Sequence, residues 1–422
     1  MALLAAFLYE RAPTLAGMYL NAPARLARVD NLPGPSAIKF AERAGFRSCE
    51  DALMVESLGL AVVACDPGRE RWNTVMGVFV PGPVSGADFY VYDYKNVAAA
   101  DDEDAVLSTV EIVGFPGGDD LHTLGMAFDE ATSTLLVSNH AQAGPRIEIF
   151  KLDFDLESAS PKPKATHVRT VRHALIHGPN SIAIVEGSGG TEFFVTNDHA
   201  VPAVRNKLVS VLETYLAPPT GTVVHVDLRG DDEVEASVVA HVPFANGIEF
   251  LNATTLAVAS TSRSAVYLYS VTGLHPAEAS ADDQGSQKKQ PPTLIYVTRI
   301  PVPFLPDNLT VTKYKSKADN EERTKLLIAG HAHAPTLTRF SASRHVCNDP
   351  TALAEADETA RAACDPEVAA PSWVSEWSEA DGLTHLYVSN EYPSSATAAR
   401  DGERGVGIIS GLYAKGLLVW RE

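Results

Sequence analysis

Amide and carboxylate side chains recur just ahead of short apolar runs at widely separated points of the chain. Asn180, Asn246 and Asn308 each stand within two residues of an isoleucine or a leucine. They follow one another at intervals of about 60 to 70 residues, which is the length of one repeat of strands. Asp307 directly precedes Asn308, and Glu50 stands before another apolar run. Carboxylate and amide oxygens are the ligands that calcium prefers.

A fold that brings these side chains together at one point would form a calcium site with open coordination positions, as a catalytic metal requires. The alternative for each residue alone is that an Asn or Asp at a strand end only makes a turn. The near-equal spacing favours the shared site for the set as a whole. We therefore predict a cation bound by the following five side chains: Glu50, Asn180, Asn246, Asp307 and Asn308.

Four histidines, His122, His140, His199 and His331, stand at the ends of expected strands. Two imidazoles near a metal can act as a general base, because one ring fixes the tautomer of the other and raises its basicity. Two other interpretations stay open. A histidine at a strand end is commonly a polar surface residue, and His331 with His333 forms a weak zinc motif.

Motifs of other catalytic classes are absent from the sequence. There is no GxSxG segment of a serine hydrolase, no phosphate-binding P-loop, and no GxGxxG after an expected strand. Hydrolysis, if the chain performs it, should be metal-assisted. Asp and Glu number 53 against 34 Lys and Arg, a net charge of -19, so we expect no nucleic-acid partner.

From about residue 37 onward, short apolar runs alternate with Gly, Pro, Asp and Asn, which is typical of antiparallel strands and tight turns. Examples are 77–80, 89–92, 134–138, 147–150, 222–226, 265–269 and 386–389. Strands this short in a chain of 422 residues favour a propeller over a single barrel. We predict an all-β fold, a six-bladed β-propeller at 37–422, preceded by a short N-terminal helix within 1–36.

The cysteines and the N-terminus bear on the compartment. Cys347 and Cys364 flank one polar segment and could form a disulfide or remain free thiols. The apolar run 1–9 is shorter than the roughly 20 residues that span a bilayer. It could be the remnant of an anchor or signal, or a helix on the body of the protein. Membrane association through the N-terminus stays open, with a secreted or membrane-associated location favoured over the cytoplasm.

Five phrases, in this order along the chain, resemble the paraoxonase/arylesterase family. Members of that family are six-bladed propeller lactonases with two calcium ions in the central tunnel. The resemblance extends over about residues 45–420. The phrases are Val137-Ser-Asn-His-Ala-Gln-Ala-Gly-Pro-Arg-Ile-Glu-Ile-Phe-Lys151, Thr196-Asn-Asp-His199, Phe244-Ala-Asn-Gly-Ile248, Asp307-Asn-Leu-Thr-Val311 and Lys415-Gly-Leu-Leu418.

The resemblance implies roles for individual residues. The five oxygen-bearing side chains would bind the catalytic calcium. A buried structural calcium would be surrounded by Asp51, the Leu124 carbonyl and the position of Ser181. His122 and His140 would form the catalytic pair, with His122 nearest the water. The remaining residues would lie in or behind the pocket wall, namely His331, Asp198 and His199.

This chain also departs from the family pattern. Ser181 stands where the family has an aspartate, so the structural site loses a charge and would bind calcium weakly or stay empty. Thr123 and Leu124 follow His122 in place of Gly-Ile. The cysteine pair that joins the family's termini has no counterpart. Residues 346–371 are extra and would reshape the pocket mouth.

The sequence thus predicts a calcium-dependent hydrolase that opens lactones and could also cleave aryl esters, with a small-molecule ester as its partner. One alternative is a propeller whose calcium is only structural and whose upper face binds a ligand or a protein. A propeller cyclase or isomerase is a third reading, but such an enzyme would lack the metal-binding carboxylates. Retention of Glu50 and Asp307 argues against it.

Overall fold

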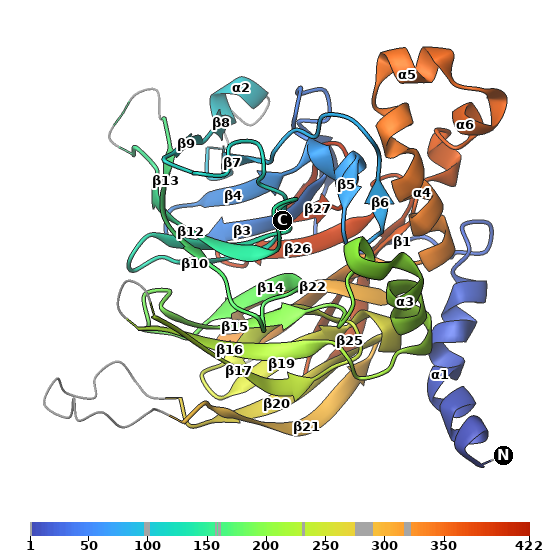
Figure 1. Cartoon of the computed structure of the whole chain (residues 1–422). Coiled ribbons are helices and arrows are strands. Elements are labelled where there is room, and N and C mark those ends of the chain that lie inside the picture. The colour runs from blue at the N-terminus through green and yellow to red at the C-terminus, as the bar shows by residue number, and fades with distance from the viewer. Residues whose placement is uncertain are drawn as a thin grey trace, which may run out of the picture.

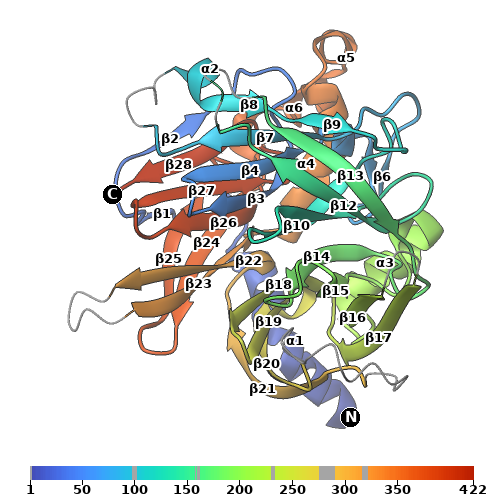
Figure 2. The same cartoon turned by 90° about the vertical axis from the view of Figure 1, so that its left-hand side faces the viewer.

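The computed structural model describes residues 2–96, 102–156, 158, 162–229, 233–274, 290–315 and 322–422. The described strands form six principal sheets of four or five strands each. These sheets surround a common centre, which is plain in the view of Figure 2. The predicted all-β, six-bladed propeller is therefore confirmed.

The first three blades follow one another along the chain, and the four main strands of each run in chain order from the axis outward. The first blade holds β3 (Cys49–Val55), β4 (Leu60–Cys65), β7 (Asp88–Asp93) and β8 (Leu107–Thr109). The second holds β10 (Thr123–Asp129), β11 (Thr134–Asn139), β12 (Arg146–Asp153), β13 (Lys164–Val171) and, parallel to β13, β9 (Glu111–Val113). The third holds β14 (Pro179–Ile184), β15 (Glu192–Asn197), β16 (Thr222–Arg229) and β17 (Glu233–His241).

The last three blades repeat this order. The fourth holds β18 (Ala245–Asn252), β19 (Thr255–Ser260), β20 (Ala265–Thr272) and β21 (Thr293–Pro301). The fifth holds β22 (Leu305–Lys315), β23 (Glu322–His331), β24 (Ser372–Ser378), β25 (Gly382–Ser389) and β1 (Val29–Asp30). The sixth holds β26 (Ser395–Asp401), β27 (Val406–Gly411), β28 (Leu417–Arg421) and β2 (Ser36–Lys39).

The N-terminal segment closes the ring of blades. Strand β2 pairs antiparallel with the C-terminal strand β28, so the two ends of the chain share the sixth blade. Strand β1 adds to the outer edge of the fifth blade by pairing with β25. Part of the segment 1–36 is therefore strand, and it continues from the helix into the propeller. Hydrogen bonds between the first and last parts of the chain hold the ring shut.

Apolar side chains between neighbouring blades form the core. Between the first and second blades, Val62, Val137 and Phe150 are fully buried together. Strand β4 is buried along its whole length, because both of its faces meet other sheets. This explains why its sequence, Leu-Ala-Val-Val-Ala-Cys, is continuously apolar instead of alternating. The packed blades fix the positions of the inner strands that surround the axis.

All six inner strands are irregular at the same place. The pairing of each with its neighbour shifts register between these residues: 49 and 51, 123 and 126, 179 and 182, 245 and 248, 306 and 309, 395 and 397. Such a bulge leaves a residue unpaired and re-aims its side chain. Glu50, Asn180, Asn246, Asp307 and Asn308 all lie within these shifts, so the irregularities are what turn them out of the regular pleat.

Helices gather at one face of the disc, at the right of Figure 1. They are α1 (Ala2–Leu20), α3 (Ala203–Leu216), α4 (Ala334–Cys347), α5 (Pro350–Glu355) and α6 (Glu358–Ala362). The short helix α2 (Glu103–Val106) lies apart from them. Strands β5 (Trp72–Asn73) and β6 (Val78–Phe79) pair with each other as a separate two-stranded sheet and complete the described strands. Among the described residues, no helix has the length and hydrophobicity to cross a bilayer.

Candidate functional site

Four of the five predicted cation ligands line one cavity of about 300 Å³ at the helix-bearing end of the axis. They are Glu50, Asn180, Asn246 and Asp307, and they come from inner strands of four different blades. The fifth, Asn308, donates a hydrogen bond from Nδ2 to Glu50 Oε1 at 2.9 Å. Segments more than 250 residues apart in sequence thus present their polar side chains to a single point.

Four of the oxygen atoms at this point have no hydrogen-bond partner among the described residues. Glu50 Oε2 and the Oδ1 atoms of Asn180, Asn246 and Asn308 are all buried without a hydrogen bond in the described structure. Buried polar atoms are almost always paired, so four orphaned acceptors in one place need an explanation. A cation bound among them would satisfy all four at once. The donor set therefore fits a hard divalent ion.

The electrostatics of the site lead to the same conclusion. Burial raises the pKa of the Glu50 carboxyl well above its ordinary value, and the nearby Asp51 and Asp307 raise it further. The Arg69 guanidinium and the Asn308 amide act in the opposite direction. Two carboxylates held close together in a dry site repel each other unless a positive charge lies between them. A divalent ion would supply that charge.

The described residues contain no group of three or more His, Cys, Asp and Glu side chains arranged to hold a metal ion. The candidate centre has a different composition, with two carboxylates and three amides. Asparagine oxygens are ordinary calcium ligands, whereas zinc and other transition metals favour imidazole and thiolate. The composition of the centre thus favours calcium over zinc.

The three residues expected around a second, structural calcium differ from the first set. Both carboxylate oxygens of Asp51 accept hydrogen bonds, Oδ2 from the Met126 N–H at 2.7 Å and Oδ1 from the Ala52 N–H at 2.8 Å. Ser181 supplies no charge, and its backbone lies tight against β10. A Cβ on Gly125 would come within 2.8 Å of the Ser181 Cα. Leu124 lines the cavity above.

His122 pairs with an aspartate. Its Nδ1 lies 3.3 Å from Asp66 Oδ2, and both side chains are almost fully buried. Its Nε2 has no hydrogen-bond partner and lies 3.8 Å from Asp120 Oδ1. His122 is not among the described residues that line the cavity, although Leu124, two residues further along, is. A proton on Nδ1 shared with Asp66 would leave Nε2 as the basic nitrogen.

His140 lies beside His122, but its ring nitrogens have other partners. Nε2 is 2.6 Å from the Pro179 carbonyl oxygen, and Nδ1 contacts the Thr74 hydroxyl. The two residues are joined through their backbones instead, since the His140 N–H donates to the His122 carbonyl at 2.8 Å. Burial is the largest of the effects that lower the pKa of the His140 imidazole below its ordinary value.

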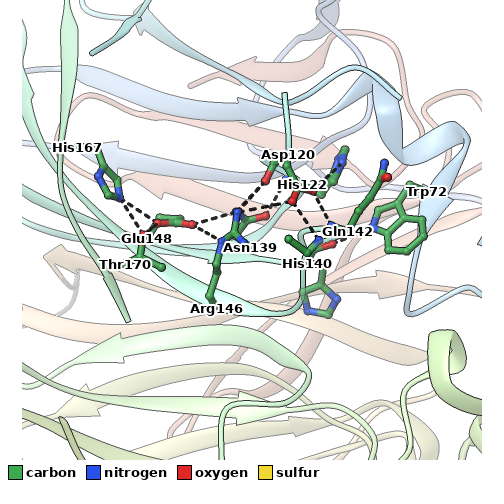
Figure 3. Close-up of polar contacts among 11 residues, drawn as sticks. Trp72, Asp120, His122, Asn139, His140, Gln142, Arg146, Glu148, His167 and Thr170 are labelled. Carbon is green, nitrogen blue, oxygen red and sulfur yellow. Dashed lines mark hydrogen bonds and ion pairs between the residues drawn. The ribbon is translucent and has the colours of Figure 1, made fainter. Parts of the chain in front are cut away.

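A buried polar network extends from His122 into the second blade (Figure 3). The His122 backbone N–H donates to Asn139 Oδ1 at 2.9 Å, and Asn139 Nδ2 lies 3.2 Å from Glu148 Oε1. The fully buried Glu148 also accepts from Arg146 Nε at 2.6 Å and faces His167 Nε2 at 2.9 Å. This network fixes the backbone that carries His122.

The other predicted residues lie around the same end of the axis. His331 lines the cavity, with Nε2 at 3.0 Å from Asp307 Oδ2 and a buried, unpartnered Nδ1. Asp198 Oδ1 lies 3.0 Å from His199 Nδ1, which holds the pKa of Asp198 below its usual range although burial alone would raise it. The His199 ring packs on Phe244, another residue of the cavity wall.

The cavity wall above the polar floor is mostly apolar and comes from helices and loops. It includes Met76, Val211, Tyr215, Leu305, Phe244, Leu337 and Leu412. Helix α3 supplies Val211 and Tyr215, and α4 supplies Leu337. The extra segment at 346–371 forms α5 and α6, and a Cys347–Cys364 disulfide closes it beside α4. Such a wall suits an uncharged, apolar ligand.

Two features of the site were not expected from the sequence. Asp66 follows a cysteine in a loop without a motif, and its position beside His122 depends on the whole first blade. A Cys49–Cys65 disulfide joins β3 to β4 directly beside Glu50. Cys49 and Cys65 are 16 residues apart on neighbouring strands, and a prediction of how these strands pair would have placed the two cysteines opposite each other. The disulfide restrains the strand end that carries Glu50.

The fold and the site can be compared with known proteins. The model of the Arylesterase family matches residues 99–275, a segment that holds His122, His140, Asn180 and Asn246. This match confirms the resemblance to the paraoxonase/arylesterase family, over less than half of the chain. No curated protein matches this chain.

Solved structures show more distant likenesses. A luciferin-regenerating enzyme is 10% identical, with a TM-score of 0.46, over 92% of this chain and 96% of its own. A candidate gluconolactonase is 11% identical, with a TM-score of 0.42, over 93% and 94%. A protein of unknown function from Desulfotomaculum acetoxidans is 9% identical, with a TM-score of 0.41, over 88% and 82%. Likenesses this distant add nothing on activity or substrate.

Proposed function

We propose that this chain is a calcium-dependent hydrolase that opens lactones and also cleaves aryl esters. The Arylesterase match supports an ester or lactone hydrolase as the general class. One observation supports calcium most strongly. Four buried oxygens, on Glu50, Asn180, Asn246 and Asn308, lie without protein partners at the floor of an apolar cavity. With Asp307, these residues would hold the ion.

A calcium ion bound there would act as a Lewis acid toward the ester carbonyl and stabilise negative charge on its oxygen. The chain's own residues would handle the protons. Asp66 orients His122 through Nδ1, which leaves Nε2 free to accept a proton from water. The hydroxide adds to the carbonyl carbon, the ring C–O bond breaks, and the leaving oxygen takes the proton back from His122. The product is a hydroxy acid.

The apolar wall would hold the acyl or aryl part of the substrate. Its residues exclude water from the floor, which strengthens the electrostatic interactions there. Exposed apolar side chains of α1 and α3 lie on the same side of the molecule (Figure 1), and we propose that this side meets a membrane surface. Besides Val211 and Tyr215 of the cavity wall, they are Phe7, Tyr9, Leu15, Tyr19, Leu20, Val204, Leu208, Leu212 and Leu216.

Calcium removal tests the proposal directly. We expect dialysis against a calcium chelator to lower lactone hydrolysis at least about a hundredfold, because the floor then lacks its electrophile. Activity should return when calcium is added. A melting curve recorded in the chelator checks that the protein is still folded. Full activity of folded, calcium-free protein would exclude a catalytic calcium.

The cavity wall should determine which acyl chains are accepted. Val211 of α3 lines the cavity while being 42% exposed, so Val211→Trp narrows the cavity with little cost to folding. We expect kcat/KM for long-chain lactones to fall about tenfold or more relative to short-chain ones. Leu212→Trp, on the same helix but outside the cavity lining, is the matched control. Equal chain-length profiles for the two variants would place the substrate elsewhere.

A further inference from the structure

A second group of residues on the axis, just outside the candidate calcium site, does not have the character of a cation site. Asp51, Leu124 and Ser181 are the positions that the family resemblance assigns to a buried structural calcium. In the first group, four buried oxygens have no partner. In the second group, both carboxylate oxygens of Asp51 accept hydrogen bonds.

The donors to Asp51 come from three different strands. Its Oδ2 accepts the Met126 N–H of β10 at 2.7 Å. Its Oδ1 accepts the Ala52 N–H of β3 at 2.8 Å and lies 2.9 Å from the Thr397 hydroxyl of β26. These three donors occupy acceptor positions on both carboxylate oxygens, so a metal ion at Asp51 would compete with them for the remaining lone pairs.

Thr397 joins this cluster to the candidate calcium site. Its Oγ1 accepts a hydrogen bond from Asn308 Nδ2 of β22 at 2.9 Å. Its own hydrogen faces two acceptors, Asp51 Oδ1 and the Glu50 carbonyl oxygen, each at 2.9 Å. The hydrogen bonds around Asp51 and Thr397 therefore connect four of the six inner strands, β3, β10, β22 and β26. A structural ion at this place would likewise link inner strands to one another.

Charge also disfavours a second ion. Ser181 is neutral, so Asp51 is the one carboxylate among the three assigned positions.

We infer that this chain holds a single cation on its axis, and that hydrogen bonds from Thr397, Met126 and Ala52 to Asp51 replace the second. The inference rests on the proposed calcium site for the first ion. It predicts one calcium per chain and a propeller whose inner strands stay joined at Asp51 without metal. Metal content and melting temperature test this inference without any assay of activity.

The experiment measures calcium in the full-length protein by elemental mass spectrometry after equilibration in calcium buffer and gel filtration. We expect one calcium per chain, and none in Glu50→Gln. Asp51→Asn should keep one calcium but melt at a lower temperature, because its Nδ2 cannot accept a hydrogen bond. Thr397→Val gives the same test with a smaller change, should Asp51→Asn fail to fold.

The outcomes separate the two claims. Two calcium ions per chain, with one lost in Asp51→Asn, would overturn the inference and leave the proposed function standing. No calcium in the unmodified protein would overturn the proposed function, and the inference with it. One calcium that is lost in Thr397→Val, while Glu50→Gln retains it, would place the ion at Asp51 and also overturn the inference.

Discussion

Glu50→Gln is expected to lower kcat/KM for lactone hydrolysis at least about a thousandfold, equivalent to roughly 4 kcal/mol of transition-state stabilisation. Glu50 is one of two carboxylates in the candidate site, and its Oε2 is buried without a partner. The substitution keeps the shape of the side chain but removes a negative charge and one acceptor. Calcium affinity should fall with activity, which isothermal titration calorimetry measures.

The matched control is Glu249→Gln. Glu249 also lies on an inner strand, and burial raises the pKa of its carboxyl to about 7. Its Oε1 accepts the Phe250 N–H at 2.9 Å, and it belongs to no ligand set. We expect its variant to keep activity within about twofold of the unmodified protein. Glu50→Gln with full activity and full calcium affinity would disprove the proposed site.

His122→Gln has the second largest expected effect. The His122 imidazole is held by Asp66 at Nδ1 and has a free Nε2, so its loss removes the proposed general base. We expect kcat to fall about 10²- to 10⁴-fold with calcium affinity unchanged. Asp66→Asn should reproduce part of this loss, because an amide no longer fixes the same tautomer. Steady-state kinetics on one lactone with calcium saturating measures both.

Two histidine variants serve as comparisons. His167→Gln changes an imidazole at the far end of the same network, 2.9 Å from Glu148, and should leave kcat within a few-fold. His331→Gln changes the imidazole that lines the cavity and holds Asp307. If His331→Gln abolishes kcat while His122→Gln retains it, the base is His331 and the assignment to His122 is wrong.

Most of the fold followed from local pattern. Short apolar runs with turn residues between them predict strands whatever their partners, and a repeat of about 60 to 70 residues predicts about six blades. The pairing of β1 and β2 with C-terminal strands was harder to foresee. Val29–Asp30 is too short to carry an alternating pattern, so nothing local marks it as strand. Its pairing with β25 depends on the closed ring.

The oxygen-bearing residues were predictable because the same structural corner recurs in each repeat. Asn180, Asn246 and Asn308 occupy equivalent bulges, and equal spacing in the sequence becomes convergence on the axis. Asp66 was not predictable in this way, because it lies outside the repeat. Likewise, the sequence shows that Ser181 lacks a charge but not that donors from β10 and β26 already satisfy Asp51.

A crystal structure of the full chain grown with calcium tests the central claim most directly. We expect one strong peak of calcium density on the axis, at about 2.3–2.6 Å from oxygens of all five residues. These are Glu50, Asn180, Asn246, Asp307 and Asn308. We also expect an open coordination position that faces the apolar cavity. Crystals grown at saturating calcium that show no density at this point, or show its oxygens bonded only to water, would contradict the proposed calcium site.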